Sequence, residues 1–220
     1  MQFDVIFDHN DFLIAYKPVG VSFHSEDSPG FVVMLEAQLN VKLFPVHRLD
    51  KVTSGLIVLA KHKAAAAKLT ALFESRQIDK FYLALIDAKP KKKQGWVKGD
   101  MAKSRRGAFK LLKSNENPAV TRFYSQTIEP GIRAVILKPF SGKTHQLRVA
   151  LKSLGAPIIG DELYAGSLAD RTYLHAYNLQ FRWDGISIDC KASPVEGELF
   201  KRFLSSEVFN DWQQPTNLEW

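Results

Sequence analysis

The chain has 220 residues, of which 45% are hydrophobic and 24% are charged, a composition that excludes a disordered or fibrous protein. No window holds the roughly 18 uncharged apolar residues that a membrane span needs, and the acidic first residues, MQFDVIFDHND, do not predict a signal peptide. The single cysteine, Cys190, rules out an internal disulfide and a cysteine-based zinc site, so we expect a reducing, cytoplasmic setting.

The formal net charge of +7 comes from one segment. Residues 89–113 hold ten basic residues and one acidic residue, Asp100, whereas the rest of the chain holds 20 basic and 22 acidic residues. Trp96 and Phe109 interrupt the basic residues, and such a surface suits a phosphate backbone, which it attracts through charge and counterion release. The alternative is a lysine-rich loop that only faces solvent.

Short apolar runs and one alanine-rich segment define the predicted elements of the first half. The turn His-Asn-Asp joins the first two strands, and the sequence Lys-Pro-Val-Gly ends the second of them. The predicted elements are a hairpin of strands 3–8 and 12–16, a helix over 31–40, a buried strand over 55–61 and a helix over 62–75.

The second half continues the mixture of strands and helices. Its predicted elements are a strand over 80–87, a hairpin of strands 119–128 and 132–139, a helix from Thr144 to Gly155, strands 173–183 and 186–190, and a closing helix over 198–206. No repeat or linker divides the chain. We therefore predict one α+β domain over residues 1–220, built on a mainly antiparallel sheet, with the basic segment 89–113 inside it.

The stretch FPVHRLDKVTSGLIVLAK places one carboxylate, Asp50, between basic neighbours and a Thr-Ser-Gly turn. The turn offers hydroxyls, backbone N–H groups and a flexible glycine, all of which suit a loop beside a ligand. A surface ion pair between Arg48 and Asp50 is the structural alternative and is worth under about 1 kcal/mol.

A second group of polar residues follows the strand 132–139. The sequence KPFSGKTHQLR enters a helix on which His145 and Arg148 are three residues apart, with Gln146 beside them. A helix N-terminus beside Lys143 and His145 is a ready anion site. The segment does not match a phosphate-binding loop of nucleotide hydrolases, because Leu137 stands where the first glycine is required.

Tyr82, in KFYLAL, is a third candidate. A tyrosine in a strand most often belongs to the core, but its ring could also face a groove, where aromatic side chains stack on bases.

Taken in chain order, these motifs resemble the RluA group of pseudouridine synthases. The resemblance runs from IFDHNDFLIAYKPVGVSFHS through HRLDKVTSGLIVLAK, KFYLAL and KPFSGKTHQLR to GAPIIGDELY and LHAYNLQF, which covers roughly residues 5–181. It implies a mixed, chiefly antiparallel sheet flanked by helices, with an RNA-binding cleft. It also implies an isomerase: the N-glycosidic bond of a uridine breaks, the uracil turns, and a C–C bond forms.

The resemblance assigns roles residue by residue. Asp50 matches the catalytic aspartate, which is ionised whether it attacks the sugar carbon or removes a sugar proton. Arg148 matches the arginine that pairs with this carboxylate and keeps it ionised. Tyr82 matches the ring that lies against the uracil and could assist proton removal at C5. Arg48 matches the residue that fills the gap when the target nucleotide flips out.

Other basic side chains are expected to contact RNA. Lys17, in the KP motif, has a supporting role; the remaining candidates are Lys143, His145, Lys91, Lys92 and Lys93. Lys143 stands where the family more often has arginine, and Ala150 where histidine is frequent, and these departures leave the substrate open rather than the reaction type. The pattern begins within the first residues, so we expect no S4-type RNA-binding module before it.

The resemblance also bears on partners. Members need no metal or other cofactor, and the histidines here show no metal-site spacing. RNA, ribosomal or transfer or both, is the expected partner; we expect no membrane, no obligatory protein partner and a monomer. Two alternatives remain: an RNA-binding protein of the same fold without catalysis, and a metal-dependent nuclease or phosphatase that uses Asp50 with His47.

Overall fold

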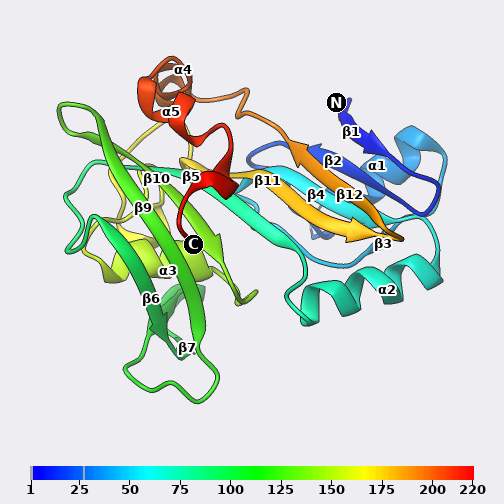
Figure 1. Cartoon of the computed structure of the whole chain (residues 1–220), viewed down its shortest axis with the longest axis horizontal. Helices are drawn as coiled ribbons and strands as arrows, with labels where there is room; N and C mark the ends of the chain where they lie inside the picture. Colours follow the sequence, from blue (N-terminus) through cyan, green and yellow to red (C-terminus); the bar gives the residue numbers. More distant parts are fainter. Residues whose placement is uncertain (1, 27) are drawn as a thin grey trace. The chain divides into compact units, whose positions relative to one another are not determined.

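The computed structural model describes residues 2–26 and 28–220 of the chain, which Figure 1 shows as a cartoon. The chain forms two compact units. The first unit holds residues 1–80 and 176–193, and the second holds residues 81–175 and 194–220. The single domain over residues 1–220 stays a prediction.

The first unit is a sheet with two helices. Its elements are β1 (Val5–Asp8), β2 (Phe12–Lys17), α1 (Phe31–Leu39), β3 (Phe44–Pro45), β4 (Ser54–Ala60), α2 (Lys63–Glu74), β11 (Leu174–Trp183) and β12 (Ile186–Lys191). The strand order is β1-β2-β4-β11-β12, and β3 pairs with the end of β4. The pairs β1–β2, β2–β4 and β11–β12 are antiparallel.

Apolar residues at alternate strand positions make the core of the first unit. Ile14 of β2 and Val58 of β4 face the same side and are fully buried, because opposite residues of antiparallel strands share a face. Leu69 of α2 packs into the same cluster. His62 is the N-cap of α2, and its ring nitrogen accepts the N–H of Ala65.

The second unit has a four-stranded sheet in the order β5-β10-β9-β6, antiparallel in its pairs β5–β10, β10–β9 and β9–β6, and a separate hairpin of β7 and β8. Its strands are β5 (Asp79–Ile86), β6 (Gln94–Gly99), β7 (Met101–Lys103), β8 (Phe109–Leu111), β9 (Ala119–Glu129) and β10 (Ile132–Pro139). Its helices are α3 (Gln146–Ser153), α4 (Glu198–Leu204), α5 (Glu207–Trp212) and the 3-10 turns η1 (Arg105–Gly107), η2 (Glu162–Tyr164) and η3 (Pro215–Asn217).

The two faces of this sheet are covered by different elements. The Gln146 amide of α3 donates to Thr121 Oγ1 of β9 (3.0 Å), so α3 lies on the face to which Thr121 points. The indole of Trp220 packs on Phe81 of β5 and Tyr124 of β9, with ring centroids 5.2 and 5.3 Å apart, and therefore lies on the opposite face.

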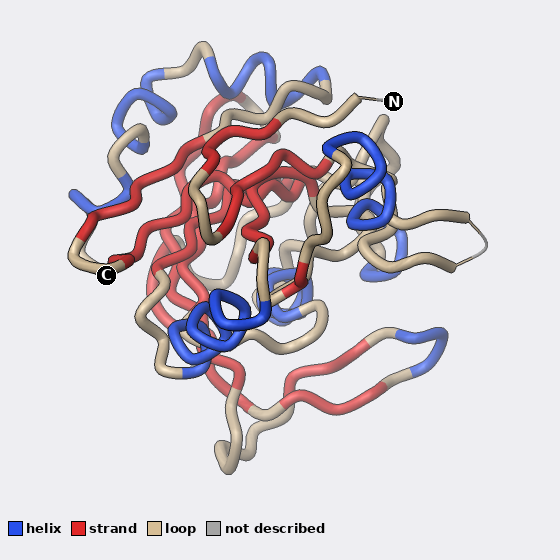
Figure 2. Tube along the Cα trace, turned by 90° about the vertical axis from the view of Figure 1, so that its right-hand side faces the viewer, coloured by secondary structure: helices blue, strands red, loops and turns tan. Residues whose placement is uncertain are grey.

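The predicted fold class, α+β with a mainly antiparallel sheet flanked by helices, is confirmed. Three details differ from the prediction. The basic segment 89–113 contains β6 and the β7–β8 hairpin, whose tip is η1 (Figure 2). α3 begins after His145, not at Thr144, because His145 takes a left-handed conformation (φ 59°). The closing helix ends at Leu204, and α5 and η3 follow it.

Across the described residues, no helix combines the length and the apolar character that crossing a bilayer requires.

Candidate active site

Asp50 lies in the loop that leads into β4, in the first unit. Its side chain is half-buried, and its carbonyl oxygen accepts the N–H of Thr53 (3.0 Å), which closes a turn before the strand. Thr53 and Ser54 are buried behind it. The loop therefore holds the carboxylate just before the start of a fully buried strand, which fixes its position.

Gly55 follows this turn because no side chain fits there. Its φ is +111°, and a Cβ at this position would lie 2.2 Å from the carbonyl oxygen of Ala176 on the neighbouring strand β11. The sequence suggested a flexible position. The structure shows instead a close approach of two backbones that fixes where the Asp50 loop meets β4.

Lys17 stabilises the same loop from within. Its side chain is fully buried, and its ammonium donates to the carbonyl oxygens of Pro18 and Val21 (2.8 Å each) and Lys51 (3.4 Å). The N–H of Gly20 also donates to Lys51 O (2.8 Å). Lys17 thus ties the Lys-Pro turn to the residue after Asp50. The prediction that Lys17 contacts RNA does not fit this position, because RNA does not reach a buried ammonium.

His47 is a packing residue of the loop. Its ring packs on Phe73 of α2 (centroids 4.5 Å apart, planes tilted by 31°), and its Nε2 accepts the N–H of Val58 (3.0 Å). Burial, with the ammonium of Lys80 as a smaller cause, lowers the pKa of His47 to about 3. With Nε2 accepting, the proton of the neutral ring is on Nδ1, so neither nitrogen has a lone pair for a metal. This argues against the metal-dependent alternative that paired Asp50 with His47.

The lowered pKa makes stability depend on pH. The unfolded chain takes up a proton on His47 below about pH 6.5, whereas the folded chain does so only near pH 3, so folding stability falls as pH drops between these values. We expect His47 to account for a loss of about 2 kcal/mol between pH 7 and pH 5. Urea denaturation of wild type and His47→Gln should show a flatter pH slope for the variant. The exposed His24, changed to Gln, should leave the slope as in wild type; equal slopes for all three proteins would contradict the assignment.

Arg148, on α3 in the second unit, is held in a fixed orientation. Its Nε donates to Oδ2 and its Nη2 to Oδ1 of Asp161, both at 2.7 Å, and both side chains are buried. The ring of Tyr164 lies under the guanidinium at 4.9 Å. A bidentate ion pair and a stacked ring together fix the plane of the guanidinium.

His145 and Lys143 lie at the start of α3. Nδ1 of His145 is 2.9 Å from the Tyr164 hydroxyl, which accepts the backbone N–H of Phe109 on β8 (2.9 Å). The ammonium of Lys143 donates to Asn117 Oδ1 (2.9 Å). Tyr164 therefore joins three parts of the second unit: the hairpin, the start of α3 and the guanidinium of Arg148.

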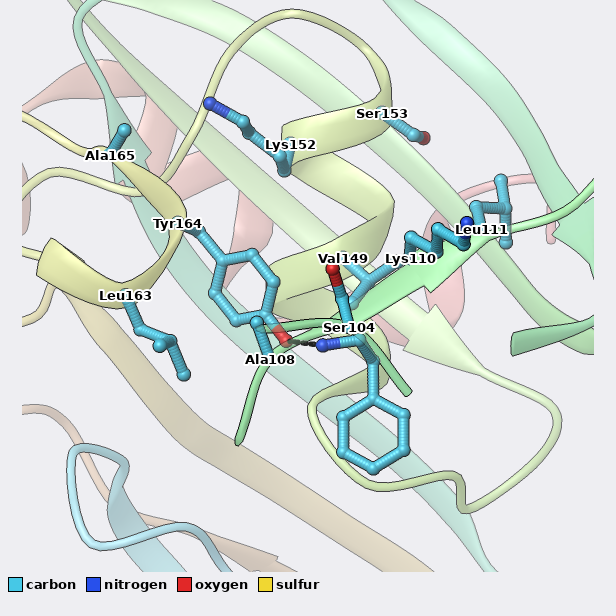
Figure 3. A pocket seen from close by; sticks show the side chains of 11 residues that line it. Ser104, Ala108, Lys110, Leu111, Val149, Lys152, Ser153, Leu163, Tyr164 and Ala165 are labelled. Carbon is cyan, nitrogen blue, oxygen red and sulfur yellow. Dashed lines mark hydrogen bonds between the residues drawn. The ribbon is translucent and has the colours of Figure 1, made fainter. Parts of the chain in front are cut away.

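A cavity of about 410 Å³ lies beside this junction (Figure 3). Phe109 and Lys110 line it from the hairpin, Val149 and Lys152 from α3, and Tyr164 from η2. The hairpin is thus fastened by the Tyr164 hydroxyl but does not fill the space against α3.

Tyr82 is half-buried on β5, opposite Leu137 of β10. The register places it on the sheet face that carries Thr121, the face covered by α3. The structure therefore puts Tyr82 and Arg148 in one unit, on the same side of its sheet. The predicted pairing of Asp50 with Arg148 joins residues of different units and stays a prediction.

The remaining predicted RNA contacts lie on the surface. Arg48 is exposed two residues before Asp50, and Lys91, Lys92 and Lys93 are exposed in the connection before β6. The described residues contain no group of three or more side chains that could hold a metal ion.

Three residues have roles at this site that were not predicted. Asp161 and Tyr164, in the GDELY motif, orient Arg148. The buried amide of Gln146 organises the Ser-Gly-Lys-Thr turn, because its oxygen accepts the hydroxyl of Ser141 (2.8 Å) and the N–H of Lys143 (3.0 Å). The motif containing Asp161 and Tyr164 was visible in the sequence, but the contacts between its side chains and α3 were not.

Comparisons with known proteins identify the family of the chain. The sequence model of the family described as RNA pseudouridylate synthase matches residues 11–153. A Haemophilus influenzae protein named as an uncharacterized RNA pseudouridine synthase is 49% identical over 204 residues, which cover 91% of each chain. A ribosomal large subunit pseudouridine synthase C of Vibrio parahaemolyticus is 31% identical over 194 residues, 81% of this chain and 61% of the relative.

A solved structure agrees as well. Human RNA pseudouridylate synthase domain containing 1 superposes with a TM-score of 0.74 at 25% identity, over 89% of this chain and 85% of the human one. The family predicted from the motifs is confirmed: the chain belongs to the RNA pseudouridylate synthases, isomerases that act on RNA.

Proposed function

We propose that this protein converts a uridine of ribosomal RNA to pseudouridine, with Asp50 as the catalytic carboxylate. The ribosomal target is supported by relatives such as the Vibrio parahaemolyticus protein, whose name places its activity on the large subunit. The setting is the cytoplasm, where ribosomal RNA is found, and the protein acts as a monomer without a cofactor.

The proposed reaction is an isomerisation, so every atom of the uridine is retained apart from exchanged protons. The carboxylate of Asp50 acts on the ribose, either at C1′ as nucleophile or on a sugar proton as base. The N1–C1′ bond breaks, the uracil turns, and C5 bonds to C1′. The proton on C5 then leaves to solvent, N1 takes up a proton, and on the nucleophilic route the bond between Asp50 and C1′ breaks as C5 takes its place.

Arg148 and Tyr82 assist Asp50 in this proposal. A guanidinium that is already oriented by Asp161 costs little to place beside a second carboxylate, and a positive charge there favours the ionised form of Asp50. The ring of Tyr82 lies against the uracil while it turns. Arg48 occupies the space that the flipped nucleotide leaves in the RNA.

The observation that carries the proposal is the placement of Asp50: a half-buried carboxylate on a loop fixed by Lys17 and Gly55, within the segment matched by the family model. The test is to map pseudouridine in total RNA with and without the gene. A site that disappears on deletion, and returns with wild type but not with Asp50→Asn, identifies both activity and target. A site that returns with Asp50→Asn would refute the role of Asp50.

Two controls address the alternatives. Added EDTA should leave the rate unchanged, since the proposed chemistry uses no metal. An RNA-binding protein without catalysis would bind RNA and restore no pseudouridine at all. A site in transfer RNA instead of ribosomal RNA would keep the chemistry and change the target.

The exposed lysines 91–93 are proposed to contact phosphates of the RNA. Each phosphate contact contributes about 0.7–0.9 to the slope of log K against log salt. We therefore expect the triple change to glutamine to lower this slope by about 2 and to weaken binding at low salt. The matched control changes Lys42, Lys63 and Lys201, also exposed, and should leave the slope nearer to wild type. Equal slopes for the two triple variants would contradict a specific contact between lysines 91–93 and the RNA phosphates.

A further inference from the structure

One face of the sheet of the second unit carries alternating aromatic and cationic side chains. Trp96 of β6 lies opposite Arg122 of β9, and Arg122 lies opposite Lys138 of β10. Opposite residues of antiparallel strands point to the same face, so these three side chains form one row across the sheet. Phe140, two residues beyond Lys138, continues the same face.

The side chains of this row contact one another through their rings and charges. The guanidinium of Arg122 lies 5.2 Å from the ring centroid of Trp96 and 5.7 Å from that of Tyr124. The ammonium of Lys138 lies 5.4 Å from the ring of Phe140. The rings of Trp96 and Phe140 are 5.1 Å apart at 44°. The cations are thus held among aromatic rings.

This face is open at the Trp96 end. Trp96 is 45% exposed, whereas the other tryptophans of the second unit are less exposed, and Lys98 is exposed beside it. The end near β5 is covered by Trp220, and the Tyr124 hydroxyl donates to the carbonyl of Glu219. The aromatic surface defined by Trp96, Phe140, Arg122 and Lys138, which we call the aromatic row, is therefore accessible from β6.

Near Trp96 the charged side chains of this face are all cations. The described side chains that β6, residues 120–126 of β9 and residues 136–140 place there include no acidic one; they are Gln94, Trp96, Lys98, Val120, Arg122, Tyr124, Gln126, Ile136, Lys138 and Phe140. Glu129, at the far end of β9, lies opposite Ile132 on the same face, where it pairs with Arg202 of α4 (2.7 Å). The buried Nε of Arg122 has no hydrogen-bond partner among the described residues. A surface with three cations, one exposed indole and no acidic side chain beside it is suited to a polyanion that also has flat apolar faces.

We propose that the aromatic row binds single-stranded RNA next to the modified site, by stacking a base on Trp96 while Lys98 and Arg122 contact phosphates. Stacking on an aromatic ring accepts any base, since every base has a π-face, and cations beside the ring add attraction to the backbone. The row is on the opposite sheet face from Tyr82, so it holds RNA that flanks the target and not the target uridine. The proposal rests on the proposed function and adds a second contact surface to it.

The test uses a fluorescein-labelled 12-nucleotide cytidine RNA, which contains no uridine and so is no substrate. Trp96→Ala should weaken its binding about tenfold in an anisotropy titration, whereas Trp96→Phe should keep most of the affinity. Leu168→Ala, another exposed apolar residue of the same unit, is the matched control and should bind as wild type. Lys98→Gln, which has little effect on folding, should lower the salt slope by about 0.7.

Wild-type affinity of both Trp96→Ala and Lys98→Gln would overturn the proposal. Its failure is distinguishable from failure of the proposed function, because the cytidine RNA reports on binding alone. Asp50→Asn should bind it as wild type does. RNA mapping could find no pseudouridine that depends on this protein while Trp96→Ala still weakens binding of the cytidine RNA. That result would support RNA binding by the aromatic row and contradict the catalytic assignment.

Discussion

Purified Asp50→Asn protein should form pseudouridine at least about 10³-fold more slowly than wild type while it stays folded. Asparagine has nearly the shape of aspartate, and the backbone carbonyl that accepts the Thr53 N–H is unchanged. The amide, however, carries no negative charge and is a poor nucleophile and base, so either proposed route at the ribose loses its reacting group. The measurement is tritium release from C5 of labelled uridine in the mapped RNA.

The control for this variant is Asp87→Asn, which makes the same chemical change at an exposed position after β5. It should keep the wild-type rate. A normal rate in Asp50→Asn, with folding verified by its thermal transition, would contradict the catalytic role. Loss of activity in both variants would indicate a general effect of charge and not a reaction centre.

Asp161→Ala should have the largest effect on stability, lowering the free energy of unfolding by about 3 kcal/mol. Removing this carboxylate deprives a buried guanidinium of two charge-assisted hydrogen bonds, and Arg148 has only 5% of its side chain exposed. For a chain of this size the loss corresponds to a melting temperature roughly 6–12 °C lower. Thermal and urea denaturation at pH 7 measure both quantities.

Asp161→Asn should fall between Asp161→Ala and wild type, because it keeps an acceptor oxygen but no charge. Glu162→Ala, at the neighbouring exposed position, should change the stability by less than about 0.5 kcal/mol. At a temperature where Asp161→Asn is folded, its rate should also fall, since the guanidinium loses its fixed orientation. If Asp161→Ala has the same melting temperature as wild type, the ion pair between Arg148 and Asp161 makes no net contribution to stability.

Much of the fold was predictable from local pattern. Strands 3–8 and 12–16 were recognised by apolar runs around a turn, and α2 by its alanine-rich apolar face. The strands β6, β7 and β8 were not predicted. In β6, glycines at the inward positions 95 and 99 and the exposed Trp96 hide the alternation that marks a strand, and β7 and β8 are only three residues long each. The start of α3 was misplaced because the left-handed conformation of His145 depends on its surroundings and not on its residue type.

Site residues that belong to a sequence motif were predictable, whereas side-chain positions that depend on tertiary packing were not. Asp50 was predicted from its motif, and its catalytic role stays a prediction. The buried position of Lys17 was not, because a lysine beside a Lys-Pro turn gives no sign of three carbonyl oxygens arranged around it. Asp161 was missed as the partner of Arg148 because the two meet only after a turn of the chain thirteen residues long.

The crowding at Gly55 has a consequence for how this sequence tolerates change. In a library of all single substitutions selected for RNA modification, position 55 should be as intolerant as position 50, although a glycine carries no reactive group. The Cβ of any other residue would lie 2.2 Å from the carbonyl oxygen of Ala176 and would displace the loop that precedes position 55. If position 55 does not tolerate substitution, the reason is the lack of space for a side chain and not a chemical role. Attempts to retarget the protein to another uridine should therefore vary neighbouring surface positions and keep Gly55.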